Sequence, residues 1–325
     1  MISSKLQTKR TGTTGFFPEI AQSCTKELQQ LGFLADVFLI PGGVGVRFNS
    51  DRHFCNLSDL AHLPIKELDF SRVSSFDPEK IQSFPLEAIR LPSGCSFPLR
   101  EFKLFRLKRF SARNCLSTDF ESLAILPIEE LCLPGSKVET LSFTHSMQLT
   151  RLDISQTVVL DLRPLSEKPL EKLNLQHTKV DNLSPLSSCP LTEINLNQTK
   201  VENLEPLRGR PLTHVELRKT LVEDLSPLME SPIESISLPG SPVRSLNPLT
   251  FCPLKYLNMI GLNHCDLLPL SEMQLDSLAI SPLELNQDDL SFLKTLNLKS
   301  LIGPGDDPNQ SVEQFFHKYG QGCLS

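Results

Sequence analysis

The sequence lacks several features that would narrow its function at once. Among 325 residues there is no Trp and there are only two Tyr, and no apolar stretch approaches the roughly eighteen residues that a membrane-spanning helix requires. Residues 1–15 are rich in Ser, Thr and Lys and lack the apolar core of a secretion signal. We therefore expect a disordered segment over 1–15 and a cytoplasmic location.

The chain also lacks an excess of one charge. It carries 32 Lys and Arg against 38 Asp and Glu, a formal net charge of -6. This balance argues against a protein that depends as a whole on attraction to DNA or to an anionic membrane. We expect neither DNA nor a membrane among its partners.

Signatures of chemistry are missing as well. The nine Cys are scattered singly, without a Cys-x-x-Cys pair, and the seven His stand far apart. The glycines at 42–45 match neither a phosphate-binding nor a dinucleotide-binding spacing, and no kinase signature occurs. These observations predict reduced thiols, no metal, no cofactor and no enzymatic activity.

What the sequence does contain is a repeat of 21 residues. Steps of 21 from Pro64 give eleven origins, most of them Pro: Pro64, Pro85, Arg106, Pro127, Gln148, Pro169, Pro190, Pro211, Pro232, Pro253 and Gln274. The residues one, four and six positions after each origin are apolar in all eleven units. A fixed spacing of this kind is not expected in a compact α/β domain, so it favours an array of stacked coils.

Each unit reads PLxxLxLxxT, followed in the cleaner copies by VxxLSPL, as in residues 180–186. The two apolar residues that alternate predict a short strand, and stacked units would pair these strands in parallel at ~4.8 Å. In LSPL, the Ser would cap a helical turn that begins with the Pro. The short unit leaves room on the outer side only for a 3₁₀ turn or extended chain. The predicted fold class is an α/β repeat solenoid, a horseshoe with its short parallel strands on the concave side.

The LxxLxLxxT pattern with LSPL resembles the leucine-rich repeat, and its VxxLSPL part is similar to the internalin-type bacterial class. A closer resemblance is to a bacterial group with LSPLxxxPLxxLxLxxTxV repeats, well represented in planctomycetes and often found beside or fused to serine/threonine kinases. It covers about residues 54–325, and the FFHKYGQG segment at 315–322 resembles the terminal segment of the same group. The resemblance implies a horseshoe solenoid in a bacterial protein and specifies no ligand.

A solenoid needs a cap at each end of its apolar core. We expect an N-terminal cap over 16–63, made of a helix and a hairpin, and repeats over 64–300. A C-terminal cap helix over 301–325 would start at a capping box formed by Ser311 and Gln314. Two irregularities stand out: Thr144 replaces an inward Leu, and the unit around Leu296 and Leu298 would arrive three residues early.

The concave face is the expected binding surface, because side chains on rigid strands lose little freedom on contact. Its polar residues follow from positions three, five and seven after the origins, and Tyr256 adds an aromatic side chain of the kind that dominates binding sites. The predicted partner-binding residues are Arg151, Asp153, Lys172, Asn174, Gln176, Glu193, Asn195, Asn197, His214, Glu216, Arg218 and Tyr256. An ordinary solvated surface is the alternative interpretation of the same residues.

Two further patterns have structural interpretations. The hydroxyl residues nine positions after the origins, such as Thr157 and Thr178, would bond backbone groups of the adjacent coil. The segment 100–113 carries six basic residues and one acid, which could meet an acidic partner or RNA, although a solvated surface is favoured. No aromatic residues are interleaved there to stack on bases, which argues against RNA.

The function predicted from these patterns is a non-catalytic scaffold that binds a protein or peptide on its concave face. The resemblance implies that it acts in a serine/threonine kinase-linked pathway. A monomer is favoured. The alternative is an enzyme or a nucleic-acid-binding factor with an unrecognised site.

Overall fold

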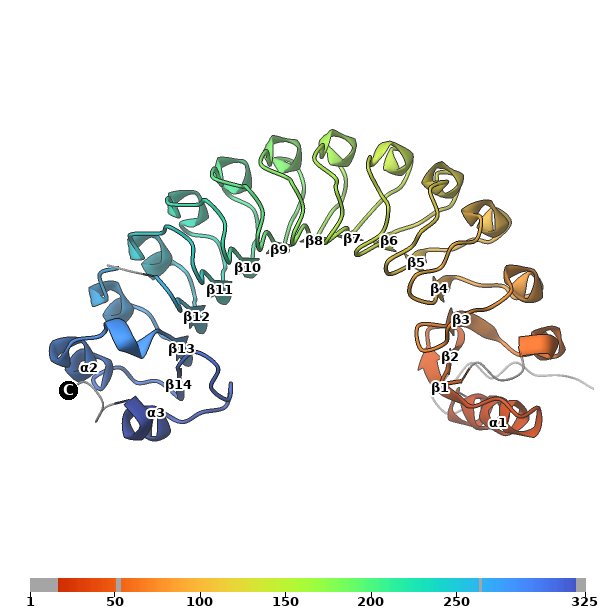
Figure 1. The fold of residues 1–325 in the computed structure, drawn as a ribbon, viewed down its shortest axis with the longest axis horizontal. Coiled ribbons are helices and arrows are strands. Elements are labelled where there is room, and N and C mark those ends of the chain that lie inside the picture. Colours follow the sequence, from red (N-terminus) through yellow and green to blue (C-terminus); the bar gives the residue numbers. More distant parts are fainter. Residues whose placement is uncertain (1–16, 51–53, 263–264, 320–325) are drawn as a thin grey trace, which may run out of the picture.

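The computed structural model describes residues 17–50, 54–262 and 265–319. The expected disordered segment, 1–15, lies outside them. These residues form an arc with one sheet along its inner edge, as Figure 1 shows, and the strands follow one another in sequence order. The fourteen strands are β1 (Ala35–Ile40), β2 (Gly43–Phe48), β3 (Ile65–Asp69), β4 (Ala88–Arg90), β5 (Arg109–Ser111), β6 (Glu130–Cys132), β7 (Arg151–Asp153), β8 (Lys172–Asn174), β9 (Glu193–Asn195), β10 (His214–Glu216), β11 (Ser235–Ser237), β12 (Tyr256–Asn258), β13 (Ser277–Ala279) and β14 (Ser300–Ile302). The horseshoe predicted from the repeat is confirmed.

The outer side consists mainly of 3₁₀ turns, as expected for so short a repeat. These turns are η1 (Phe54–Leu60), η2 (Pro78–Ile81), η3 (Leu99–Phe102), η4 (Phe120–Leu123), η5 (Ser142–Thr144), η6 (Arg163–Leu165), η7 (Ser184–Leu186), η8 (Glu205–Leu207), η9 (Ser226–Leu228), η10 (Asn247–Phe251), η11 (Leu268–Glu272) and η12 (Pro282–Glu284). Three α-helices lie toward the two ends: α1 (Phe17–Gln30), α2 (Gln287–Leu293) and α3 (Val312–Tyr319). Within the described residues, no helix is both long and apolar enough to cross a membrane.

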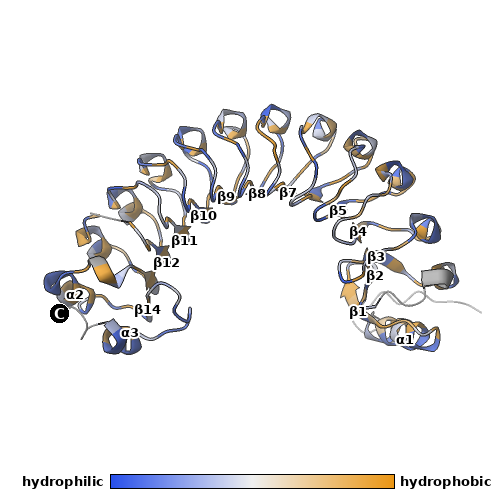
Figure 2. Ribbon diagram, in the orientation of Figure 1, coloured by the Kyte–Doolittle hydropathy of each residue, from blue (hydrophilic) through white to orange (hydrophobic). Residues whose placement is uncertain are grey.

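The core is a continuous apolar column inside the coils. Figure 2 shows hydrophobic and hydrophilic residues alternating around each coil, so every coil has an apolar side to bury. The parallel register places equivalent residues side by side, as with Leu152, Leu173 and Ile194, which are all buried. Thr144 also lies in this column, fully buried, and its hydroxyl donates to the Leu141 carbonyl at 2.8 Å. The hydrogen bond explains how a polar residue is accommodated at a Leu position.

The N-terminal end is covered by α1 and by the antiparallel hairpin of β1 and β2. Strand β2 then pairs in parallel with β3, so the hairpin extends the sheet of the repeats. At Gly45 a Cβ would come within 2.3 Å of the Phe38 ring, so any larger residue there would force this ring to move. In the neighbouring coils, phenylalanines fill the core: Phe48 stacks on Phe70, and Phe70 stacks on Phe76 with ring centroids 4.3 Å apart.

At the C-terminal end, α3 begins at the capping box that the sequence predicts. The Gln314 N–H donates to the Ser311 hydroxyl at 3.2 Å, and the Ser311 N–H donates to the Gln314 side chain at 2.9 Å. Phe315 is fully buried beneath the helix. An end cap of this kind shields the open cross-section of the solenoid from water.

The last coil differs from the prediction. Its strand was expected three residues early, but β14 pairs Ser300 with Ser277, a spacing of 23 residues rather than 21. The reason is that α2, a true α-helix with its own capping box at Asn286, replaces the usual outer turn and needs more residues. The longer coil leaves an open hollow of about 520 Å³ against its neighbour, lined by Leu270, Met273 and Leu298 among others.

The prediction for the Ser of LSPL is also wrong. In η7, Leu183 is the N-cap and makes no side-chain cap, while Ser184 is already the first residue of the turn. The acceptor is the side chain two residues earlier: Asn182 Oδ1 accepts from the Ser184 N–H at 2.9 Å. Asp161, Asn203 and Asp224 repeat this bond in their coils. The Asn or Asp two residues before the turn forms an Asx turn with this N–H, so its side chain and not that of the Ser supplies the cap.

The hydroxyl row bonds differently from the prediction in most coils. Thr178 donates to the carbonyl of Leu175 in its own coil at 2.7 Å. The same bond is made by Thr157, Thr199, Thr220 and Ser241. His177, just before Thr178, has a φ of 57°, which turns the chain back over that carbonyl. Ser136 alone of this row follows the prediction, since it bonds Cys115 N–H and the Ala112 carbonyl of the preceding coil.

Candidate functional site

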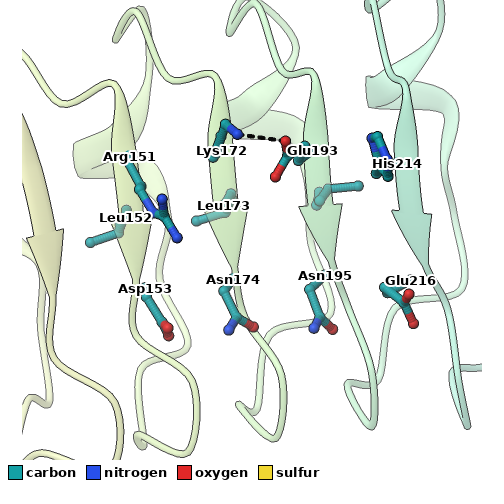
Figure 3. Close-up of a pocket in the computed structure, with 11 residues that line it drawn as sticks. Arg151, Leu152, Asp153, Lys172, Leu173, Asn174, Glu193, Asn195, His214 and Glu216 are labelled. Carbon is teal, nitrogen blue, oxygen red and sulfur yellow. Dashed lines mark hydrogen bonds and ion pairs between the residues drawn. The ribbon is translucent and has the colours of Figure 1, made fainter. Parts of the chain in front are cut away.

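The concave face carries an open depression of about 250 Å³ across β7, β8, β9 and β10. Figure 3 shows its two rows of polar side chains, one at the start and one at the end of the strands. Eight of the twelve predicted binding residues line it: Arg151, Asp153, Lys172, Asn174, Glu193, Asn195, His214 and Glu216. Between the rows lie the inward-turned residues of the core, such as Leu173.

The row at the strand starts consists of Arg151, Lys172, Glu193 and His214. Lys172 Nζ and Glu193 Oε1 form an ion pair at 2.5 Å on neighbouring strands, and both side chains remain about 40% exposed (42% and 41%). A pair this exposed contributes little to stability. Arg151 is exposed and, among the described residues, has no acidic side chain within ion-pair distance. Arg151 is therefore the cation of this row that a partner carboxylate could reach.

The row at the strand ends consists of Asp153, Asn174, Asn195 and Glu216. The first three each turn a side-chain oxygen back to the backbone N–H two residues later, at 2.9, 3.1 and 3.0 Å. These bonds end the strand and fix the side chains in place. Asn174 and Asn195 line the depression, and with their oxygens engaged they can donate to a ligand through their amide N–H groups.

Four predicted residues lie outside the depression. Gln176, Asn197 and Arg218 follow the strands, because each strand holds only three residues and position seven lies in the turn beyond it. Asn197 acts as a bridge between coils: its amide donates to Glu216 at 3.2 Å, and its oxygen accepts from the Arg218 N–H at 2.7 Å.

Tyr256 is the fourth and lies two strands beyond His214, on β12. It is half-buried, and burial, together with the charge of Glu216, raises the pKa of its phenol. Between Tyr256 and the depression lies β11, whose Ser235 and Ser237 are small and uncharged. The predicted surface thus divides into a charged depression and a neutral region with one aromatic ring.

The sequence prediction missed a second charged cluster, on the concave face of the first coils. Glu67 and Asp69 on β3 are 8% and 1% exposed, and arginines from three other strands surround them. Arg47 contacts Asp69 and Arg109 contacts Glu67, both at 2.8 Å, while Arg90 lies 3.8 Å from Glu67. Glu67, Asp69, Arg90 and Arg109 occupy the same repeat positions as the residues of the depression, and Arg47 lies on the hairpin strand β2 in register with Asp69. The shared repeat position of these charged residues is the sequence pattern that could have identified the cluster.

The arrangement in the depression suits noncovalent recognition. It offers donors from Arg151, Asn174 and Asn195 and acceptors from Asp153 and Glu216, all on a rigid sheet. Within the described ranges, no group of three or more His, Cys, Asp or Glu side chains could hold a metal ion. Hydrogen bonds and ion pairs are the interactions that these side chains can make with a ligand.

Comparison with known proteins supports the fold. The sequence matches no protein-family profile and none of the curated proteins compared with it. In structure, the chain is similar to an internalin, InlF, from Listeria monocytogenes, with a TM-score of 0.52 and 15% identity over 80% of this chain and 92% of that one. Internalin C2 of the same organism gives a TM-score of 0.50 and 14% identity over 70% of this chain and 91% of that one. The fold is that of bacterial leucine-rich-repeat solenoids.

Proposed function

We propose that this protein is a non-catalytic scaffold that binds an extended segment of a partner protein across the depression of its concave face. The observation that carries the proposal is the pair of parallel polar rows on four neighbouring strands, of which the row at the strand ends is held in place by hydrogen bonds to the backbone. Groups fixed in this way pay little conformational entropy when a ligand binds.

The two rows suggest what the partner segment contains. Arg151 at one end of the depression would take a carboxylate, while Asp153 and Glu216 would take basic or hydrogen-bond-donating groups. The amides of Asn174 and Asn195 would donate to main-chain carbonyls of the segment. The preferred partner is therefore a polar chain of mixed charge.

Two parts of the proposal, the kinase link and the cellular location, rest on the sequence. The serine/threonine kinase link depends on the resemblance of the LSPL repeats to those of kinase-associated proteins. The cytoplasmic location depends on the cysteines, of which seven in the described residues are free thiols. RNA is a weaker alternative, because Arg109 of the basic segment is bonded to Glu67 rather than free.

The proposal can be tested by site-specific photo-crosslinking in a lysate of the source cells. A photoreactive residue at position 174 lies in the depression, and one at exposed position 187 lies on the outer side of the same coil. We expect a discrete protein adduct from position 174 and none from position 187. Equal adducts at both positions, or none at position 174, would overturn the proposal.

A charge swap supplies the matched variant. The double change Lys172→Glu with Glu193→Lys preserves the ion pair and exchanges its ends, so it leaves the fold unchanged and alters only the pattern that a partner meets. We expect the adduct at position 174 to fall at least about tenfold, as for loss of one well-placed charged contact. An undiminished adduct would show that Lys172 and Glu193 take no part in binding.

A further inference from the structure

Two cysteines on consecutive coils lie in direct contact. The Sγ atoms of Cys95 and Cys115 are 3.4 Å apart, in the turns that follow β4 and β5. Both residues are buried, with 7% and 0% of their surfaces exposed. The sequence shows only single cysteines 20 residues apart, and the pairing becomes visible once the coils are stacked.

The backbone around the two cysteines has the separation that a disulfide requires. The Leu116 N–H donates to the Cys95 carbonyl at 2.7 Å, and the Gly94 N–H donates to the Arg113 carbonyl at 3.0 Å. Chains held at hydrogen-bonding distance fall in the range of Cα separations, roughly 4.4–6.8 Å, that disulfides span. To reach a bond of about 2.05 Å, each sulfur needs to move by less than ~1 Å.

The contact also favours ionisation of one of the two thiols. The hydrogen bond from the Cys95 thiol lowers the pKa of Cys115 to about 6, against the opposing effect of burial, and hydrogen bonds from Ser117 act in the same direction. These hydrogen bonds favour the thiolate form of Cys115 over that of Cys95.

We propose that Cys95 and Cys115 are an oxidation site at which a peroxide converts two thiols into a disulfide between the second and third coils of the array. In the first step, the Cys115 thiolate attacks one peroxide oxygen. The O–O bond breaks, and hydroxide leaves and takes up a proton, so that Cys115 becomes a sulfenic acid. In the second step, Cys95 loses its proton and attacks that sulfur, the S–O bond breaks, and water leaves. Two thiols and one hydrogen peroxide give one disulfide and two waters.

Other buried cysteines of the chain provide controls. Cys189 and Cys252 donate weakly to backbone carbonyls of the preceding coil, at 3.5 and 3.6 Å, and burial raises the pKa of each thiol. Cys132 and Cys265 are partly exposed. Oxidation of Cys132 and Cys265 shows that the oxidant reaches partly exposed thiols. Cys189 and Cys252 show how a buried thiol without a neighbouring cysteine responds.

The experiment treats the full chain with graded hydrogen peroxide, blocks remaining thiols with an alkylating agent, and maps the unreduced digest by mass spectrometry. We expect an intramolecular link between the peptides of Cys95 and Cys115, reversed by dithiothreitol, while Cys189 stays reduced. Oxidation should also raise the Tm by a few degrees, on the order expected for a crosslink closing a 20-residue loop.

The variants Cys95→Ser and Cys115→Ser should lose both the link and the shift in Tm, and Cys189→Ser should keep both. Serine is compatible with the site, because Ser136 occupies the same repeat position as Cys115. The proposal is wrong if Cys95 and Cys115 remain reduced at peroxide concentrations that oxidise Cys132 and Cys265. It is equally wrong if Cys115 is oxidised beyond the sulfenic acid without linking to Cys95.

Discussion

Arg47 donates its Nε–H to the carboxylate of Asp69, 2.8 Å away, and so joins the N-terminal hairpin to the first coil. Asp69 is 1% exposed, and its other oxygen accepts from the Ser71 N–H at 2.9 Å. A buried carboxylate is stable only when it is paired and hydrogen-bonded in this way. The attachment of the cap to the repeats therefore depends on a charge as well as on apolar packing.

We expect Asp69→Asn to lower the free energy of unfolding by about 1–2 kcal/mol, because the amide keeps an acceptor for Ser71 but loses the ion pair. Asp69→Ala should lower the free energy of unfolding further, by about 3 kcal/mol, because it removes the ion pair and the acceptor for Ser71 together. Urea denaturation measures both. Arg72→Ala is the control, since Arg72 and Asp36 form an exposed pair at 3.4 Å that should contribute less than about 0.5 kcal/mol. Equal losses for Asp69→Ala and Arg72→Ala would contradict the role assigned to Asp69.

Both ends of the array should be sensitive to acid. At the C-terminal cap, Asp306 accepts from Lys318, from the Gly303 N–H and from the Tyr319 hydroxyl. Burial opposes ionisation of Asp69 and of Asp306, but the hydrogen bonds outweigh it and hold the pKa of each carboxyl below its ordinary value of 3.8. The stabilisation is fully present above pH 3.8 and is lost as the pH falls through the lower folded-state pKa.

As the pH falls below about 4, we expect the backbone amides at the two ends, around β2–β3 and β14–α3, to lose protection from hydrogen exchange first. The middle coils should open only at a lower pH. Hydrogen exchange at a series of pH values measures this directly. In Asp69→Asn, the N-terminal end should lose most of its pH dependence, and the C-terminal end should keep its own. Uniform loss along the chain would show that the two carboxylates do not control the ends.

The sequence was sufficient for the fold because the fold depends on periodicity. Apolar residues one, four and six positions after each origin, such as Leu170, Leu173 and Leu175, are buried wherever the 21-residue step holds. The prediction was wrong where the step changes, at α2. A capping box at Asn286 and Asp289 specifies that helix, and its two extra residues could not be counted without knowing where β14 pairs.

Predicting the candidate site from sequence was less accurate, for geometric reasons. The repeat position identifies which residues lie on the strands, and it therefore placed Lys172 and Asn174 on the concave side, where they line the depression. It could not show that the strands end after three residues, which leaves Gln176 outside. Contacts between coils, such as Arg109 with Glu67 two coils away, depend on side-chain length and direction, and no sequence period encodes them.

The cap of each outer turn can be tested within one coil. Asn182→Ala removes the acceptor for the Ser184 N–H and should cost about 0.5–1 kcal/mol, as for loss of a helix cap. Ser184→Ala should change the stability by less than about 0.5 kcal/mol, because that hydroxyl caps nothing. Asn182→Asp restores an acceptor and should be close to the original protein. If urea denaturation shows a larger loss of unfolding free energy for Ser184→Ala than for Asn182→Ala, the Ser and not the Asn is the cap.

The hydroxyl row provides a separate test of what closes each coil. Thr178 is buried, and its hydroxyl donates to the Leu175 carbonyl at 2.7 Å, directly after His177 with its positive φ. Thr178→Val keeps the shape but removes the donor, so the carbonyl loses a partner at a cost of about 1–2 kcal/mol. Thr178→Ser keeps the donor and loses one methyl group, at a cost of about 1 kcal/mol or less. If Thr178→Val is as stable as the original protein in thermal unfolding, the hydroxyl row contributes through its shape alone and the hydrogen bond is dispensable.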